Sequence, residues 1–375
     1  MNDIFNIAIS GSYGGFNLGD EAILQSIITQ LRSSVPEVKI TVFSKDPEDT
    51  LKRHNTDHVI DVRKLNANEV KSEIEKVDLF ILGGGGILYD AHAKLYLREV
   101  IVARENNIPV MTYAIGAGPL ETQAAQDLVR DTLNNVDVIT VRERSAQTLL
   151  ESIGVKKEIT VTADPALLLQ PEPLPDDLPI KELLQEKQKL VAMSVREPGV
   201  AAPDINQEQY HSLLADAADY IVDRLHAKVV FIPMERNKKD VQHSHAILSQ
   251  MLKPQNAWVL KGDYSPGQML SIIGNFDFAI GMRLHFLIFA AIQRVPFVAL
   301  PYSSKVAGFL EDLDIIMPPI QLVNAGRLIA HIDHFWDVKY ELISKLDELL
   351  PIAQQKALET NTLLLKLIDK TKKDR

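Results

Sequence analysis

Residues 5–24 read FNIAISGSYGGFNLGDEAIL. An apolar run ends at Ser10, a glycine-rich turn follows, and an amphipathic stretch begins near Asp20, where we expect the N-cap of a helix. Short apolar runs and longer amphipathic stretches alternate from there onward, which is typical of βα units in a parallel sheet. The chain is therefore predicted to be an α/β protein of Rossmann-like architecture.

The length of 375 residues indicates two domains, because single hydrophobic cores stop growing at roughly 250–300 residues. The alternation stops at Gln170, where QPEPLPDDLP contains four prolines, and restarts at Leu190. We expect a Rossmann-like domain (1–169), a proline-rich linker (170–189), a second Rossmann-like domain (190–332) and C-terminal helices (333–375) that pack back toward the first domain. Pro351 is expected to interrupt these helices.

The expected strands are 5–10, 39–43, 58–61, 78–82, 109–114, 137–141 and 158–162 in the first half, and 190–195, 228–233, 257–260, 276–281 and 297–301 in the second.

Composition excludes several functions. The net charge of −10 argues against a nucleic-acid partner, and the absence of cysteine excludes disulfides and thiolate catalysis. The N-terminus lacks a basic region, and Arg294 and Pro296 interrupt the longest apolar run, so neither a signal peptide nor a membrane span is expected. We expect a cytoplasmic protein with at most peripheral membrane contact, and the inner face of the membrane is the alternative location.

Three glycine-rich turns follow expected strands: GSYGGFNLG from Gly11, GGGG at Gly83–Gly86, and AIGAGPL at 114–120. Glycines allow a ligand to approach the backbone closely, and a helix N-terminus offers unpaired amides. Because Asp20 and Glu21 stand where a phosphate would bind, a sugar hydroxyl is the favoured ligand of the first turn. A capped helix after a tight turn is the structural alternative. Asp90 follows the second turn, and two interpretations of it stay open: a ligand-binding group, or the exposed start of a helix.

Cationic side chains follow several expected strands: Arg142, Arg144, Arg196, Arg283 and Lys305. The strongest stretch is MRLHFLIFAA, in which Arg283 and His285 open an apolar helix. Burying an unpaired charge is costly, and histidine exchanges protons near neutral pH, so this pair favours an anion site with an acid. A lone histidine at a helix start is otherwise structural. We expect no metal, because His243 and His245 would point to different faces of a helix.

The sequence resembles the polysaccharide pyruvyl transferase family, and within it the bacterial cell-wall enzymes that are associated with S-layer anchoring. The matching stretches are GSYGGFNLGDEAIL, LGGGGILYD, AIGAGPL, VRERSA, TADPALLL, SVREPG, MRLHFLIFAA and ALPYSSKVAGFLEDL, which run from residue 9 to about 313.

The resemblance implies two facing Rossmann-like domains of the GT-B type, with an acceptor side in 1–169 and a donor side in 190–332. It implies phosphoenolpyruvate as donor, a glycan acceptor that is free or lipid-linked, a pyruvate ketal as product, and no cofactor. His285 corresponds to the general acid, and Asp20 and Asp90 are the candidate bases. The candidate donor ligands are Arg142, Arg144, Arg196, Arg283 and Lys305, and the candidate acceptor ligands are Gly14, Gly15, Asn17, Gly84, Gly85 and Gly116.

Two other functions stay open at this point. A nucleotide-sugar glycosyltransferase would use the same architecture with a diphosphate in the second domain. A non-catalytic two-lobed protein would keep the ligand cleft without the acid. The acceptor sugar, the hydroxyl groups that are bridged, the ketal stereochemistry and the oligomeric state do not follow from the sequence.

Overall fold

The computed structural model describes residues 4–90, 92–197, 206–235, 239–300, 303–318 and 324–374. The chain divides into two compact units. Unit 1 comprises Met1–Leu169 and Ala353–Arg375, and unit 2 comprises Gln170–Ile352.

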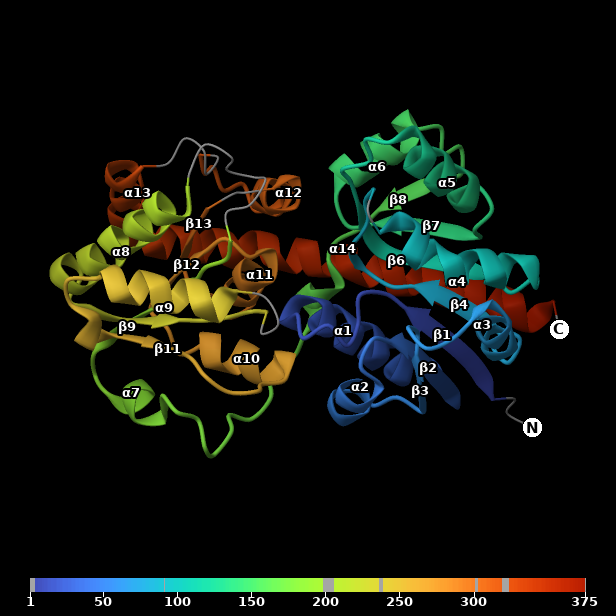
Figure 1. Ribbon diagram of the computed structural model, residues 1–375, viewed down its shortest axis with the longest axis horizontal. Helices are drawn as coiled ribbons and strands as arrows, with labels where there is room; N and C mark the ends of the chain where they lie inside the picture. The colour runs from blue at the N-terminus through green and yellow to red at the C-terminus, as the bar shows by residue number, and fades with distance from the viewer. Residues whose placement is uncertain are drawn as a thin grey trace. The chain divides into compact units, whose positions relative to one another are not determined.

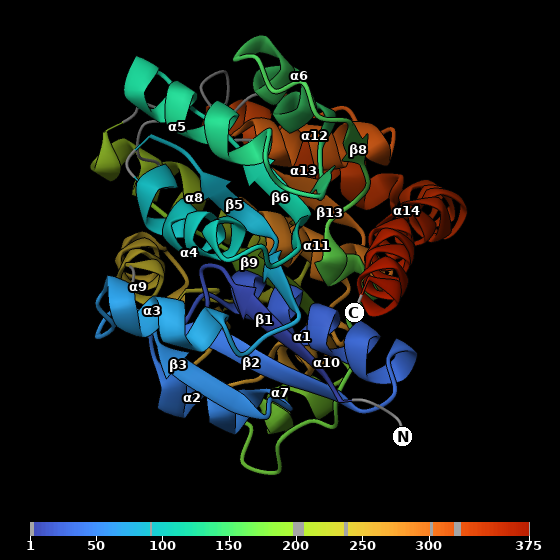
Figure 2. The same ribbon diagram turned by 90° about the vertical axis from the view of Figure 1, so that its right-hand side faces the viewer.

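Unit 1 is built on a parallel sheet that has eight strands within the described residues. The order is β3-β2-β1-β4-β6-β7-β8, and β5 pairs with β6; Figure 2 shows β3, β2 and β1 side by side. The strands are β1 (Phe5–Ser10), β2 (Val38–Ser44), β3 (His58–Asp61), β4 (Leu79–Leu82), β5 (Gly85–Leu88), β6 (Val110–Ala117), β7 (Val138–Val141) and β8 (Ile159–Val161).

The helices of unit 1 cover the sheet because its central strands are apolar on both faces. All residues of β4 are buried, as expected for a parallel strand covered on both sides. Side chains of α3, α4, α5 and α6 share one buried cluster with the strands. The helices are α1 (Leu18–Ser34), α2 (Pro47–Arg53), α3 (Ala67–Ile74), α4 (Ala93–Glu105), α5 (Gln123–Leu133) and α6 (Arg144–Ser152), with the short 3₁₀ helix η1 (Pro165–Leu168).

Unit 2 repeats this architecture with a parallel sheet in the order β11-β10-β9-β12-β13. Its strands are β9 (Lys189–Ser194), β10 (Ala227–Phe231), β11 (Ala257–Val259), β12 (Phe278–Gly281) and β13 (Phe297–Ala299). Helices α8, α9 and α13 bury apolar side chains against it. The helices are α7 (Lys181–Gln185), α8 (Gln207–Arg224), α9 (Asp240–Gln250), η3 (Pro254–Asn256), α10 (Pro266–Ile273), α11 (Leu284–Ile292), α12 (Ser304–Asp312), α13 (Ala325–Asp337) and α14 (Lys339–Lys373).

Helix α14, red in Figure 1, is one continuous helix of 35 residues. The expected interruption at Pro351 is wrong, since the helix continues through the proline, with Leu350 and Ala353 buried on either side of it. Its C-terminal part belongs to unit 1. There the hydroxyl of Thr360 bonds that of Thr162 at 2.7 Å, and the Asn361 amide donates to Ser34 Oγ at 3.2 Å.

The α/β fold with two Rossmann-like units and a helical C-terminus confirms the predicted fold class. Every expected strand overlaps an observed one, although residue 301 lies outside the described part of the chain. The sequence did not indicate β5, because its first two residues are glycines of the GGGG turn. Within the described residues, no helix is long and apolar enough to cross a membrane.

Candidate active site

The glycine-rich turns of unit 1 lie at the carboxyl edge of its sheet. The order of strands reverses between β1 and β4, and the first two turns follow these two strands. In open α/β sheets, ligands bind at such a reversal, outside the carboxyl ends of the strands. The position of these turns therefore fits a ligand site in unit 1.

The first turn is held by a buried carboxylate. Glu21 accepts a hydrogen bond from Gly14 N at 2.9 Å, and its other oxygen lies 2.8 Å from Nε2 of the buried His54. Gly14 has a φ of +68°, and a Cβ there would lie 2.2 Å from Ser44 Oγ. Glu21 is thus committed to the shape of the turn, and glycine is required where the turn meets β2.

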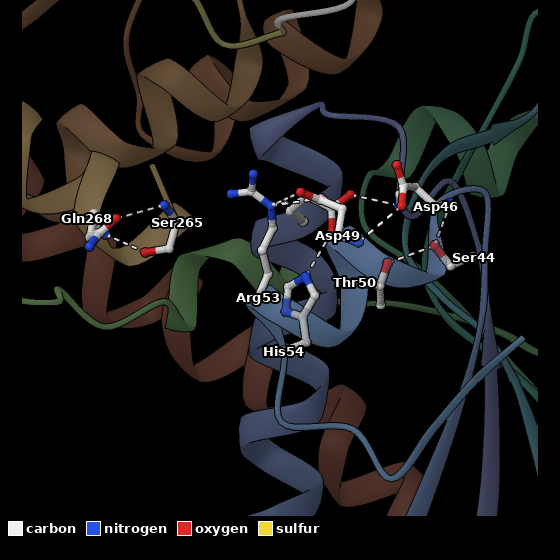
Figure 3. A network of polar contacts seen from close by, with 10 residues as sticks. Ser44, Asp46, Asp49, Thr50, Arg53, His54, Ser265 and Gln268 are labelled. Atoms are coloured by element: carbon white, nitrogen blue, oxygen red, sulfur yellow. Dashed lines mark hydrogen bonds and ion pairs between the residues drawn. The ribbon is translucent and has the colours of Figure 1, made fainter. Parts of the chain in front are cut away.

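The loop after β2 is held by hydrogen bonds of its own (Figure 3). The hydroxyl of Ser44 bonds that of Thr50 at 2.7 Å and accepts from Asp46 N at 3.0 Å. Asp46 in turn caps α2 by accepting from Asp49 N at 3.0 Å. These bonds fix the start of α2, and with it the position of His54 behind Glu21.

Asn17, and not Asp20, is the N-cap of α1. The Asn17 side chain accepts from Gly19 N at 3.0 Å, and Asp20 lies in the first helical turn. The expected cap at Asp20 is wrong, because the helix begins two residues earlier at Leu18. Asp20 is instead brought next to the second turn, where a Cβ on Gly85 would lie 3.3 Å from Asp20 Oδ1.

The second turn is packed tightly by the chain itself. A Cβ on Gly83 would lie 1.9 Å from the hydroxyl oxygen of the fully buried Tyr13, and one on Gly84 would lie 3.1 Å from the Tyr113 carbonyl. Neighbouring segments of unit 1 therefore approach the backbone of the four glycines closely and occupy part of the space beside it. Gly85 has a φ of +108°, while Gly86 is exposed.

Arg142 follows β7 and connects the second and third turns. It is buried and bonds to Glu143 at 2.7 Å and to Asp164 at 2.9 Å. Burial alone would lower the pKa of Arg142, but the two carboxylates outweigh it and the pKa is raised, so the side chain is always charged. A Cβ on Gly86 would lie 3.5 Å from the Nη2 atom of Arg142, and one on Gly116 would lie 3.0 Å from it.

Two other candidates of unit 1 have different surroundings. Asp90 accepts hydrogen bonds from Glu121 N at 2.8 Å and from the backbone and hydroxyl of Thr122 at 3.1 and 3.0 Å. The Glu121 bond in particular holds the pKa of Asp90 below its usual value, which makes it a weak base and gives it a clear role in fixing the start of α5. Arg144 lies exposed at the first turn of α6.

The cationic candidates of unit 2 follow three neighbouring strands. Arg196 comes after β9, Arg283 and His285 come after β12, and Lys305 comes after β13; these strands are adjacent in the sheet and parallel. Carboxyl ends of adjacent parallel strands share one edge, so the sheet topology places the four side chains along one edge of unit 2. His285 is partly buried and is the second residue of α11.

Arg283 is paired with two carboxylates. Its Nη1 atom lies 2.8 Å from Glu235 Oε2, and its Nη2 atom lies 2.5 Å from Asp240 Oδ1. The segment that follows β10 supplies both acids, so the buried charge of Arg283 is compensated within unit 2. These acids were not singled out from the sequence, because Glu235 and Asp240 follow β10 without a glycine-rich turn.

A pair of buried histidines was also missed. His211 on α8 and His243 on α9 bond to each other at 2.8 Å between Nε2 and Nδ1. Burial lowers the pKa of both rings, so both are neutral at pH 7. Helical periodicity could have placed them on inward faces, but not opposite each other. No group of three or more side chains among the described residues could hold a metal ion.

A profile for polysaccharide pyruvyl transferases matches residues 17–304, which span both units. The chain belongs to the polysaccharide pyruvyl transferase family. The match begins at Asn17, the N-cap of α1, and includes the Gly83–Gly86 turn, Arg142, Arg196, Arg283 and His285. The sequence-based recognition of this family is thereby confirmed.

A curated relative of this pyruvyl transferase is the amylovoran biosynthesis protein AmsJ of Erwinia amylovora. It is 20% identical over 391 residues, which cover 90% of this chain and 94% of AmsJ. The relation places the enzyme among proteins of polysaccharide biosynthesis.

Solved structures with a similar fold include an epimerase and a glycosyltransferase. UDP-GlcNAc 2-epimerase from Neisseria meningitidis is 13% identical with a TM-score of 0.66, and covers 98% of this chain and 100% of its own. A glycosyltransferase from Rickettsia africae is 12% identical with a TM-score of 0.63, and both chains are covered completely. At these identities, the similarity establishes only that the pyruvyl transferase has a GT-B-like fold.

The packing of the second turn leads to a stability test. Gly83→Ala should destabilise the protein by about 1–3 kcal/mol, because the added methyl group overlaps the buried Tyr13 ring, which has little room to move. Gly86→Ala is the matched control and should stay within about 0.5 kcal/mol, because its nearest neighbour is 3.5 Å away. Urea unfolding measures both; equal stability of the two variants would contradict this packing.

Proposed function

We propose that this pyruvyl transferase moves the pyruvyl group of phosphoenolpyruvate onto a sugar of a cell-wall or surface polysaccharide precursor. The observation that carries the proposal is the row of Arg196, Arg283, His285 and Lys305 after three neighbouring strands of unit 2. Phosphoenolpyruvate has a carboxylate and a phosphate, and arginine binds both in bidentate fashion. A histidine beside such cations is suited to protonate the enol carbon.

Ketal formation joins two sugar hydroxyls to C2 of phosphoenolpyruvate and releases phosphate. His285 delivers a proton to the methylene carbon of phosphoenolpyruvate, and a sugar hydroxyl adds to C2 as its own proton passes to a base. The C2–O bond to phosphate then breaks, and phosphate leaves with the bonding electrons. A second hydroxyl of the same sugar closes the ketal and gives up its proton, so that the two hydroxyl protons end on the new methyl group and on phosphate.

Acceptor binding is assigned to unit 1, around the first two glycine turns. Asp20 is the preferred base, because it lies beside Gly85 at the carboxyl edge, whereas both oxygens of Asp90 hold the loop before α5. Gly14, Gly15 and Asn17 form the turn that precedes Asp20. Contacts of the acceptor with Gly84 and Gly116, and of the donor with Arg142 and Arg144, stay predictions.

Ligand specificity separates this proposal from a nucleotide-sugar glycosyltransferase. Phosphoenolpyruvate should raise the Tm of the full chain, because a ligand that binds only the folded state stabilises it. UDP- and GDP-sugars should leave the Tm unchanged at the same concentration. A rise with nucleotide sugars and none with phosphoenolpyruvate would favour the glycosyltransferase.

The acid role of His285 is tested by substitution. His285→Ala should reduce acceptor-dependent phosphate release by about 10²–10⁴-fold, because general acid catalysis contributes this much, and should keep the fold and the Tm shift with phosphoenolpyruvate. His245→Ala, an exposed histidine on α9, is the control and should be fully active. Near-normal turnover of His285→Ala would show that another group protonates the donor.

A further inference from the structure

We propose that Asp240 and Glu235 are positioning residues that aim the guanidinium of Arg283 at the donor. This inference rests on the proposed function, since it concerns how Arg283 recognises phosphoenolpyruvate. Neither acid is assigned a contact with substrate. Their effect passes through Arg283, to which both are bonded.

The two acids hold Arg283 at two points. Glu235 Oε2 accepts from Nη1 at 2.8 Å and Asp240 Oδ1 accepts from Nη2 at 2.5 Å. A planar guanidinium that is bonded through both terminal nitrogens to separate carboxylates cannot rotate about its long axis without breaking a bond. The side chain is buried with only 8% of its surface exposed, so the alternatives to this orientation are few.

Asp240 is itself anchored by the backbone. Its Oδ2 atom accepts from Met234 N at 3.2 Å and from Glu235 N at 3.1 Å, and only 1% of the residue is exposed. It is the first residue of α9, where a negative charge is favourable. Asp240 therefore fixes the backbone of Glu235 and the guanidinium of Arg283 together.

The segment before Arg283 is held by a different contact. The hydroxyl of the buried Tyr210 donates to Met282 Sδ at 2.6 Å, which ties the end of β12 to α8. The contact of Met282 therefore holds the chain next to Arg283, whereas the two acids orient the guanidinium of Arg283.

Charge alone would argue against this arrangement in an anion site. One guanidinium and two carboxylates sum to −1, and a nearby negative charge weakens the binding of an anion. Positioning and charge therefore make opposite predictions for the loss of one carboxylate. If orientation dominates, donor affinity falls; if charge dominates, donor affinity rises.

Asp240→Asn separates these effects with little change in shape. The Asn oxygen can still accept from Met234 N and Glu235 N. The NH₂ group then faces Arg283, so that two donors meet and the hydrogen bond to the Nη2 atom of Arg283 is lost. We expect the Kd for phosphoenolpyruvate, measured by calorimetry on the full chain, to rise about tenfold, a loss of about 1.4 kcal/mol.

Glu235→Gln is the second variant, and it keeps an oxygen that can accept from Nη1. It should also raise the Kd for phosphoenolpyruvate, but by less than Asp240→Asn does. It also keeps the proposal testable if Asp240→Asn fails to fold.

Asp137→Asn is the matched control. Asp137 accepts from Arg104 at 2.8 Å and from Val110 N at 2.9 Å, so it combines an arginine and a backbone partner as Asp240 does, but it precedes β7 at the opposite edge of the sheet of unit 1. It should lower the Tm without changing the Kd for phosphoenolpyruvate.

A double-mutant cycle shows whether Asp240 acts through Arg283. Arg283→Lys should weaken donor binding, and adding Asp240→Asn to it should cause no further loss, because the lysine ammonium has no plane to orient. Additive losses would overturn the inference. An unchanged or lower Kd in both Asp240→Asn and Glu235→Gln would also overturn it, and a wild-type chain that does not bind phosphoenolpyruvate would overturn the proposed function as well.

Discussion

A guanidinium that is removed from water has to be matched by carboxylates, and both units of this chain meet that requirement at the carboxyl edge of their sheets. Arg142 is bonded to Glu143 and Asp164, and Arg283 is bonded to Glu235 and Asp240. Breaking a buried ion pair by removing one partner typically costs about 3–5 kcal/mol. The loops that carry these acids are therefore tied to the arginines, and the shape of each edge depends on them.

The surroundings of the two arginines differ. In unit 1, the Nη2 atom of Arg142 lies near Gly86 and Gly116, where glycines keep side chains away from it. In unit 2, Arg283 occupies the N-cap position of an apolar helix without a capping bond from its side chain, and His285 follows two residues later. The first edge suits a ligand that approaches the backbone, and the second suits an anion that needs a proton. This difference underlies the assignment of acceptor and donor to separate units.

The sequence predicted the fold well because strands of a parallel sheet are short apolar runs, and a turn signal follows each. It failed where the structure depends on partners from distant segments. Nothing local shows that Arg283 meets Asp240, or that His211 faces His243, because these pairs depend on how α8, α9 and α11 pack. The helix start at Leu18 differs from expectation because Asn17, an equally good capping residue, occupies the N-cap position, whereas α14 continues through Pro351. The family motifs located the candidate cations, but not their acids.

In the proposed reaction, the pyruvyl carbon of phosphoenolpyruvate becomes the ketal carbon of a sugar. This transfer is tested most directly by ¹³C NMR with phosphoenolpyruvate labelled at C2 and a glycan precursor as acceptor. The label should move from the enol carbon to a saturated carbon that is bonded to two sugar oxygens and a methyl group, with one phosphate released per label transferred. Label that remains in phosphoenolpyruvate, or that appears as free pyruvate with every acceptor offered, would contradict it.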